Sequence, residues 1–375
     1  MTYTREQLEN MMAKARLLGK DIDQLNTKCG HALYLLKDIL DEAVILYIPD
    51  DVESTEEEDL GPSYAWSTPN PSYCDIECKT LIVFGGKNLM NAGHMFYKCS
   101  AQSLDLSNFD TSKVTNMHEM FRECQAQSID LSSFDTSNVT DMSEMFNCCH
   151  AQSLDLSSFG NSSVTNMRNM FYGCQAQSIN LSSFGTSSVT DMSGMFDCCR
   201  AHYLDLSNFD TSNVTDMSGM FCHCPAELDL SSFDTSKVTN MSHMFFGYRG
   251  AQSLDLSNFD TSRVTSMLEM FGECEAQSID LSSFNTSKVT DMGGMFRECE
   301  AQLLDLSNFD TSKVKDMHEM FCDCKAQSID LSSFDISHVK SLRQWFEGCK
   351  SEVKATDDAI LFKARRNGLK VVTQK

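Results

Sequence analysis

The sequence predicts an α/β solenoid, and the first observation behind this prediction is an internal repeat. The segment AQSLDLSNFDTSKVTNMHEMFRECQ at 101–125 returns with small changes at steps of 25 residues, up to about residue 350. A fixed period of this size is typical of units that stack, because one unit alone cannot bury its apolar face. We therefore expect about eleven rungs of roughly 25 residues between residues 76 and 350.

The second observation is the apolar pattern inside one unit. Leu104 and Leu106 alternate with Asp105, which is the period of a short, half-buried strand. From Val114 to Cys124 the apolar positions follow the spacing of one helix face. Between the two lies Asp110, whose equivalents are good N-cap residues for that helix. Each rung is thus expected to run strand, corner, short helix and return.

The third observation is that apolar residues recur in columns along the repeat. Each unit carries a Met-Phe pair, as at Met120-Phe121, and we expect this stripe to be core because Met fills irregular gaps. Eleven of the 17 cysteines form another column, in which Tyr248 takes the place of a missing member. We expect buried, unpaired thiols there. The column contains Cys74, Cys99, Cys124, Cys149, Cys174, Cys199, Cys224, Cys274, Cys299, Cys324 and Cys349.

An acidic ladder occupies the outward position of the expected strands. Its members are Asp105, Asp130, Asp155, Asp205, Asp229, Asp255, Asp280, Asp305 and Asp330, with Asn180 in the same column. A serine follows two residues after each of them. Like charges on adjacent strands repel, so two interpretations stay open. Either local hydrogen bonds relieve the carboxylates, or the ladder binds divalent cations or a basic protein partner.

A register defect supplies a second candidate binding site. The unit around Pro225 is one residue short and the next is one residue long, which gathers Phe246, Tyr248 and Arg249. These residue types are favoured at binding hot spots. The alternative is a pair of length changes without function.

The regions that flank the repeat lack its 25-residue pattern and are expected to form other structures. Residues 1–48 are expected to be a helical segment, because heptad spacing predicts helices over 4–28 and 31–47. These helices would cap the solenoid as a hairpin or form a homo-oligomer as a coiled coil. Residues 49–75 are expected to be an acidic linker. Residues 351–375 are expected to close the repeat (76–350) with a helix ending at Arg366 and a strand at 369–372.

Composition and motifs exclude several classes of function. The net charge of −23 argues against nucleic acid as a partner. No apolar run is long enough to span a membrane, and the N-terminus lacks the layout of a signal peptide. The nine histidines have no fixed acidic partner in the repeat, and the Cys-x-Cys pairs at 222–224 and 322–324 do not match zinc spacing. We therefore expect no enzyme, no cofactor and no metal ligands.

The units LDLSNFDTSNVTDMSGMF (204–221) and LDLSSFDTSKVTNMSHMF (228–245) resemble the BspA-like leucine-rich repeat and the repeat of bacterial surface lipoproteins. This resemblance implies a right-handed, leucine-rich-repeat-like stack and a cell-surface role in binding or adhesion. The thiol ladder and the missing signal peptide favour the cytoplasm instead. The function expected is a non-enzymatic protein-binding or adhesion module. The alternative is a structural scaffold held together through the N-terminal helices.

Overall fold

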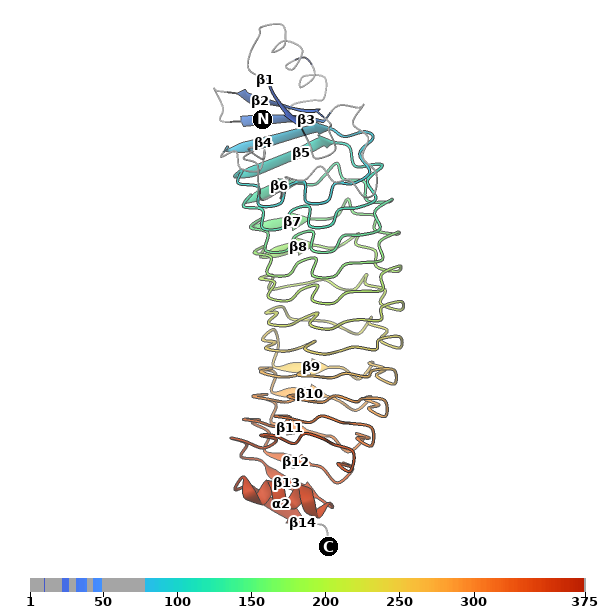
Figure 1. Ribbon diagram of the computed structural model, residues 1–375, viewed down its shortest axis with the longest axis vertical. Coiled ribbons are helices and arrows are strands. Elements are labelled where there is room, and N and C mark those ends of the chain that lie inside the picture. Colours follow the sequence, from blue (N-terminus) through green and yellow to red (C-terminus); the bar gives the residue numbers. More distant parts are fainter. Residues whose placement is uncertain (1–9, 11–21, 27–31, 39–42, 49–77, 374–375) are drawn as a thin grey trace. The chain divides into compact units, whose positions relative to one another are not determined.

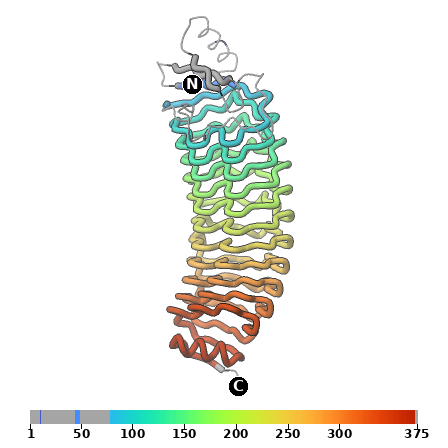
Figure 2. Tube along the Cα trace, in the orientation of Figure 1, coloured from blue at the N-terminus to red at the C-terminus, as the bar shows by residue number. Residues whose placement is uncertain are grey.

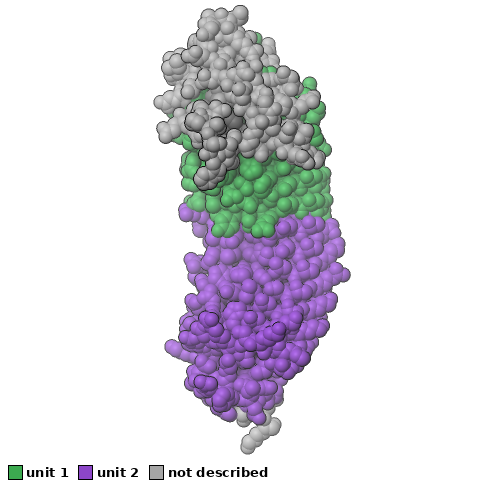
Figure 3. Space-filling model, viewed as in Figure 1, with its two compact units in different colours: residues 1–188 green, residues 189–375 purple. Residues whose placement is uncertain are grey.

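A computed structural model describes residue 10 and residues 22–26, 32–38, 43–48 and 78–373. The chain divides into two compact units, residues 1–188 and 189–375, which are called unit 1 and unit 2 below (Figure 3). Within each unit, successive turns of the backbone follow almost the same path (Figure 2). Both units are parallel β-solenoids built from the 25-residue repeat.

Unit 1 contains a six-stranded sheet whose strands lie in chain order, and a separate pair of strands (Figure 1). The first three strands pair antiparallel, and from β3 onward the pairing is parallel. The strands of the sheet are β1 (Ile22–Asn26), β2 (Ala32–Asp38), β3 (Ala43–Ile48), β4 (Thr80–Gly85), β5 (Ser103–Phe109) and β6 (Ser128–Asp130), and the pair is β7 (Ser153–Asp155) with β8 (Ser178–Asn180).

Unit 2 contains a parallel sheet in the order β14-β13-β12-β11-β10-β9. Its strands are β9 (Ser253–Asp255), β10 (Ser278–Asp280), β11 (Leu303–Leu304), β12 (Ser328–Asp330), β13 (Glu352–Ala355) and β14 (Lys370–Thr373). Helix α2 (Asp358–Arg366) lies between the last two strands, capped by Asp357, whose side chain accepts from the backbone of Ala359 and Ile360. This end therefore has the helix and the strand that the sequence predicts.

The second half of each rung is not a helix, so the predicted α/β architecture is wrong. Within residues 78–373, α2 is the only α-helix. In the rung at 117–124 the backbone N–H groups alternate: Met117, Glu119 and Phe121 donate to the next rung, whereas Met120 and Arg122 close tight turns within their own rung. Hydrogen bonds between rungs replace the bonds that a helix would make. The right-handed sense of the stack stays a prediction.

Left-handed backbone conformations make these turns possible. Glu119 and Glu123 have φ of 53°, and the same two positions are left-handed in rung after rung. Glycine takes the place of Glu119 at Gly219 and of Glu123 at Gly173. Glycine adopts positive φ without steric cost, whereas an α-helix needs negative φ throughout. The recurrence of glycine in these two columns was the sequence signal against a helix.

The predicted core columns are confirmed in the residues described. The phenylalanines of the Met-Phe pairs stack nearly face to face. The ring centroids of Phe121 and Phe146 lie 5.3 Å apart in unit 1, and those of Phe245 and Phe271 lie 5.8 Å apart in unit 2. The column cysteines from Cys99 onward are buried; Cys74 lies outside the described residues. Burial disfavours a thiolate and raises the pKa of the Cys149 thiol to about 12.

Two sets of side-chain hydrogen bonds, rather than helix capping, stabilise the corners. Asp110 accepts from the backbone and the hydroxyl of Ser112, at 3.0 and 2.6 Å, which closes an Asx turn. The next residue, Thr111, is buried; its Oγ1 donates to the carbonyl of Asp135 on the next rung and accepts from the same residue's N–H. Each buried threonine of this column thus ties two rungs together.

The predicted N-terminal helices are wrong over residues 22–26, 32–38 and 43–48, whereas residue 10 is helical as predicted. Residues 22–26, 32–38 and 43–48 are strands, and β3 pairs in parallel with β4. Val44, Ile45, Leu46 and Ile48 are all buried. A short run that is apolar on both faces fits a strand covered on both sides as well as it fits a helix, so spacing alone did not decide. The predicted linker at 49–75 lies outside the described residues.

Candidate functional site

Most members of the acidic ladder lie on strands, as the alternation predicts, whereas Asp205, Asp229 and Asp305 lie outside them. Partner residues across the parallel pairing include Asp105 with Asp130 in unit 1 and Asp255 with Asp280 in unit 2. Most members are exposed, and the others are half-buried. The structure therefore does place carboxylates opposite one another on neighbouring strands.

Local hydrogen bonds hold each carboxylate. In unit 1, Asp105 Oδ1 accepts from the backbone N–H of Ser107 at 3.1 Å and from its hydroxyl at 2.6 Å. The same Asx turn recurs at Asp205 in unit 2. Hydrogen bonds from the following serine stabilise the anion and lower the pKa of Asp205 below its usual value. The ladder is therefore relieved locally and still keeps its negative charge.

The ladder has one counter-cation at its C-terminal end. Lys354 Nζ lies 2.6 Å from Asp330 Oδ2, because Lys354 takes the ladder position on β13. Burial tends to raise the pKa of Asp330, and the hydrogen bonds from Lys354 and Ser332 outweigh it, so the pKa is lowered. In unit 1 the neutral side chain of Asn180 occupies a ladder position, and its amide donates a hydrogen bond to Asp155 Oδ1 at 2.8 Å.

A hollow interrupts the ladder of unit 2 near the register defect. No strand pairing joins 228–230 to β9, although these rungs are consecutive in the described chain. A hollow of about 270 Å³ lies between them. It is lined by Leu228, Asp229, Leu230, Ser231, Ser253, Leu254, Asp255, Ser257 and Asn258. Two ladder carboxylates therefore flank a depression rather than a closed sheet.

An exposed aromatic ring lies one rung before the hollow. Tyr203 is 69% exposed and forms a parallel bridge with Glu227, the residue that precedes the hollow-lining segment. Leu303 is equally exposed on β11. A large apolar side chain beside carboxylates is the kind of anchor that protein interfaces use. Composition alone did not single out Tyr203, but its outward place in the strand alternation could have.

The three defect residues singled out by sequence do not form one site. Tyr248 is fully buried, and its hydroxyl donates to the carbonyl of Ala226 at 3.0 Å. The ring of Phe246 packs against His223 and His243, and the guanidinium of Arg297 lies over it at 5.6 Å. None of these residues lines the hollow.

The third defect residue, Arg249, remains accessible. Its side chain is 57% exposed and pairs with Glu275 at 3.1 Å. Because Tyr248 is buried, only Arg249 and the half-buried Phe246 could meet a partner at this place.

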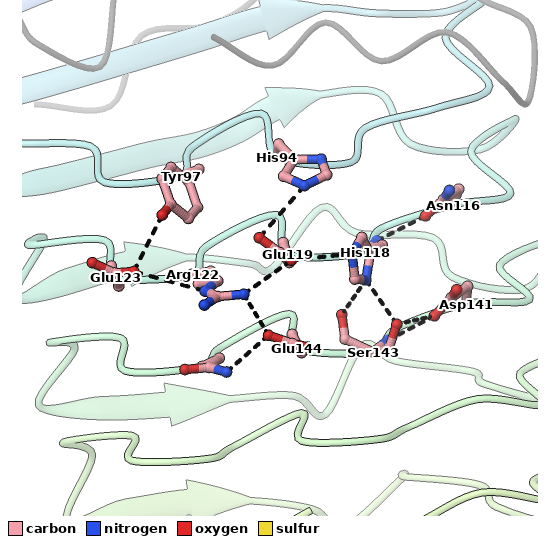
Figure 4. A network of polar contacts seen from close by, with 11 residues as sticks. His94, Tyr97, Asn116, His118, Glu119, Arg122, Glu123, Asp141, Ser143 and Glu144 are labelled. Carbon is pink, nitrogen blue, oxygen red and sulfur yellow. Dashed lines mark hydrogen bonds and ion pairs between the residues drawn. The ribbon is translucent and has the colours of Figure 1, made fainter. Parts of the chain in front are cut away.

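The turn side of unit 1 carries a polar cluster that sequence reasoning missed. The carboxylate of Glu119 contacts three side chains: His94 Nε2 at 3.4 Å, His118 Nε2 at 3.2 Å and a guanidinium nitrogen of Arg122 at 3.0 Å (Figure 4). Arg122 continues to Glu144 on the next rung at 2.6 Å. The prediction that the histidines lack an acidic partner is therefore wrong here. Residues 94 and 119 share one repeat position, so superposing the repeats would have shown the contact.

Among the residues that the structure describes, the cysteines outside the column belong to no group with metal-ligand geometry. Cys222 is buried, and Cys322 lies 3.5 Å from a carboxylate oxygen of Asp323. Burial raises the pKa of the Cys322 thiol to about 11. In the described ranges, the one group with metal-ligand geometry is His94, His118 and Glu119. None of the helices in those ranges has the length and apolar character needed to cross a membrane.

Comparison with known proteins gives a family. No curated protein matches the chain. A crystal structure of the pneumococcal vaccine antigen PcpA aligns over 95% of this chain and 99% of that chain, with 10% identity and a TM-score of 0.25, which is too low to support an inference. The family described as "Mycoplasma protein of unknown function, DUF285" matches residues 90–202, 170–254 and 246–358. These matches span most of the repeat, and the chain belongs to this family.

Proposed function

We propose that this protein is a non-enzymatic binding module whose acidic ladder in unit 2 receives a basic segment of a protein partner. The observation that carries the proposal is the hollow between Asp229 and Asp255. A closed ladder offers only a flat face, whereas this interruption gives a depression with a carboxylate on each side. A lysine or arginine side chain has the charge and the length to enter it.

The electrostatics support a basic partner over a neutral one. The chain carries a net charge of −23, and hydrogen bonds from the following serines lower the pKa of Asp229 and Asp255. Both carboxylates therefore stay ionised at neutral pH. A row of anions also attracts a basic segment at a distance, which speeds association at low salt.

Tyr203 supplies an apolar contact beside the charges. Ion pairs at an exposed surface contribute only about 0.2 to 1 kcal/mol each, so charge alone gives weak binding. An exposed ring one rung away from the hollow adds buried area and fixes the direction of an extended peptide. We infer that the partner presents a basic residue followed by an apolar one.

Adhesion at a cell surface and the scaffold alternative are the two narrower proposals. The resemblance to BspA-like repeats supports adhesion at a cell surface, and labelling of intact cells with a membrane-impermeant reagent would test that location. The scaffold alternative depended on N-terminal helices, and residues 22–26, 32–38 and 43–48 of that segment are strands. We therefore favour the binding module.

The test uses an oligolysine peptide of defined length as the probe. We expect calorimetric titration to show binding that weakens as salt rises, and the double variant Asp229→Asn/Asp255→Asn to bind about two- to tenfold more weakly. The matched control is Asp210→Asn/Asp234→Asn, which removes the same charge from the corner column of unit 2. Equal losses in both double variants would show a diffuse charge effect and contradict a site at the hollow.

A further inference from the structure

The polar cluster on the turn side of unit 1 has the geometry of a metal site. We propose that His94, His118 and Glu119 bind one divalent transition-metal ion of the Zn²⁺ class. Their ligand atoms lie within 4.8 Å of one another. Two imidazole nitrogens and a carboxylate are a ligand set that zinc accepts, with the remaining position left to water or an external donor.

Each imidazole–carboxylate distance is close to the separation of two ligand atoms at a tetrahedral ion. With metal–ligand bonds of about 2.0–2.1 Å, neighbouring ligand atoms in a tetrahedron lie about 3.4 Å apart. Glu119 Oε2 lies 3.4 Å from His94 Nε2, and Glu119 Oε1 lies 3.2 Å from His118 Nε2, so each imidazole faces its own oxygen of one carboxylate. Figure 4 shows both imidazoles directed at the same carboxylate from different rungs. A small movement of the side chains thus suffices to enclose an ion.

The tautomer of His118 follows from its other nitrogen. Nδ1 lies 2.8 Å from the Ser143 hydroxyl oxygen and 3.1 Å from the Ser143 carbonyl oxygen. The hydroxyl donates its own proton to Asp141 at 2.5 Å, so it accepts from His118. Both partners of Nδ1 are therefore acceptors, and Nδ1 carries the hydrogen. The Asp141–Ser143–His118 chain is the supporting contact that fixes a metal-binding histidine.

That tautomer leaves an electron pair on Nε2 facing a carboxylate oxygen. Two electron pairs at 3.2 Å repel unless a cation lies between them. The cation is either a second proton on the imidazole or a metal ion. A metal ion serves His118 and His94 together, because both nitrogens face Glu119.

The backbone holds the ligands in place before any ion arrives. The N–H of His94 donates to the carbonyl of His118 at 2.9 Å, and the N–H of Glu119 donates to the carbonyl of Ser143 at 3.0 Å. The side chains of His94, His118 and Glu119 are 29, 33 and 15% exposed, so an ion can enter from solvent. Arg122 contacts Glu119 as well, but Glu144 also holds its guanidinium, at 2.6 Å.

Unit 2 contains a natural control. His318-Glu319 occupy the repeat positions of His118-Glu119, but Gly294 stands where His94 would be. The imidazole of His318 is held by Asp316 at 2.8 Å. This pair lacks the second imidazole and belongs to no metal-ligand group in the described ranges. The proposal therefore assigns the ion to unit 1.

The test uses the full-length protein, reduced and stripped of metal with a chelator, and Zn²⁺ or Co²⁺ alone as the probe. We expect calorimetry to show a tight site that His94→Asn and Glu119→Gln abolish and that His318→Gln leaves unchanged. Asparagine tolerates the left-handed backbone of position 94. Ser143→Ala should weaken binding about 10- to 100-fold without touching a ligand.

Two further readouts keep the test decisive. Zn²⁺ should raise the melting temperature of the wild type and of His318→Gln, but not of His94→Asn. The Co²⁺ spectrum should lack the intense charge-transfer bands of thiolate ligation. No tight binding, unchanged binding in His94→Asn and Ser143→Ala, or thiolate bands would each overturn the site. In that case the cluster consists of imidazolium–carboxylate pairs or the metal sits on cysteines.

Discussion

The two halves of each rung share a core but differ in how the backbone is held. The strand half, as in β5, pairs through regular parallel bonds and presents carboxylates outward. The turn half, as in Met117 to Cys124, pairs through every second N–H group and places thiols inward. The comparison teaches that apolar spacing reports which residues face the core but not which backbone carries them.

The comparison also explains what sequence could predict. The alternation around Asp105 has one structural interpretation, and the strand with its outward ladder was predicted correctly. The spacing from Val114 to Cys124 fits one helix face, yet left-handed residues such as Glu119 let the same side chains reach the core from stacked turns. Glutamate seldom adopts that conformation, so only the glycine columns pointed to it.

For a related reason, the sequence predicted the acidic ladder but neither the hollow nor the polar cluster around Glu119. The ladder follows from a pattern within one repeat. The hollow near Asp229 depends on how two units of unequal length stack, and the contact between His94 and Glu119 joins residues of different rungs. Contacts of this kind become visible only after the repeats are superposed. Tyr248 was misread because its column position, which marked it as core, was set aside in favour of its residue type.

Alkaline pH should damage the turn half most. Burial raises the pKa of the Cys149, Cys224, Cys274 and Cys324 thiols to about 12, from an ordinary value of 9.0. A raised pKa means that the stability is fully present below pH 9 and is lost as the pH approaches 12. For one such thiol, three pKa units correspond to about 4 kcal/mol. Urea unfolding midpoints that stay constant between pH 8.5 and about 11 would contradict burial of the column.

Removing one stacked ring should be the largest single-residue effect. Phe221 is fully buried in the turn half, with ring centroids 5.9 Å from both Phe196 and Phe245. We expect Phe221→Ala to lower the free energy of unfolding by about 3–5 kcal/mol, because it leaves a cavity. Phe246→Ala removes a half-buried ring of the turn half; it is the matched control and should cost less. Urea denaturation measures both.

The corner between the halves should respond to loss of a hydroxyl. Thr311 is buried, and its Oγ1 donates to the carbonyl of Asp335 at 2.9 Å and accepts from the same residue's N–H at 2.8 Å. Thr311→Val keeps the shape and leaves both groups without this partner, which should cost about 1–3 kcal/mol. Thr215→Val, at an exposed threonine whose Oγ1 donates to the carbonyl of Thr190, is the control. Equal losses would mean that burial of the corner threonines contributes nothing.

Substituting a left-handed glycine should change the free energy of unfolding least, but it should differ clearly from substituting a glycine without left-handed φ. Gly219 has φ of 63°, and a Cβ there would meet no atom closer than 3.9 Å. Gly219→Ala should therefore cost about 1–2 kcal/mol through backbone conformation alone. Gly185 also has open space but no left-handed φ, so Gly185→Ala should be neutral or slightly stabilising. A neutral Gly219→Ala would remove the argument for left-handed turns.

The far-UV circular dichroism spectrum tests the central claim most directly, because a stack of turns and a stack of short helices differ most in helix content. Within residues 78–373 the account allows one helix, the nine residues of α2. It predicts a spectrum dominated by β structure and turns. A strong double minimum typical of α-helices, of the size expected if each Met-Phe segment were helical, would contradict it.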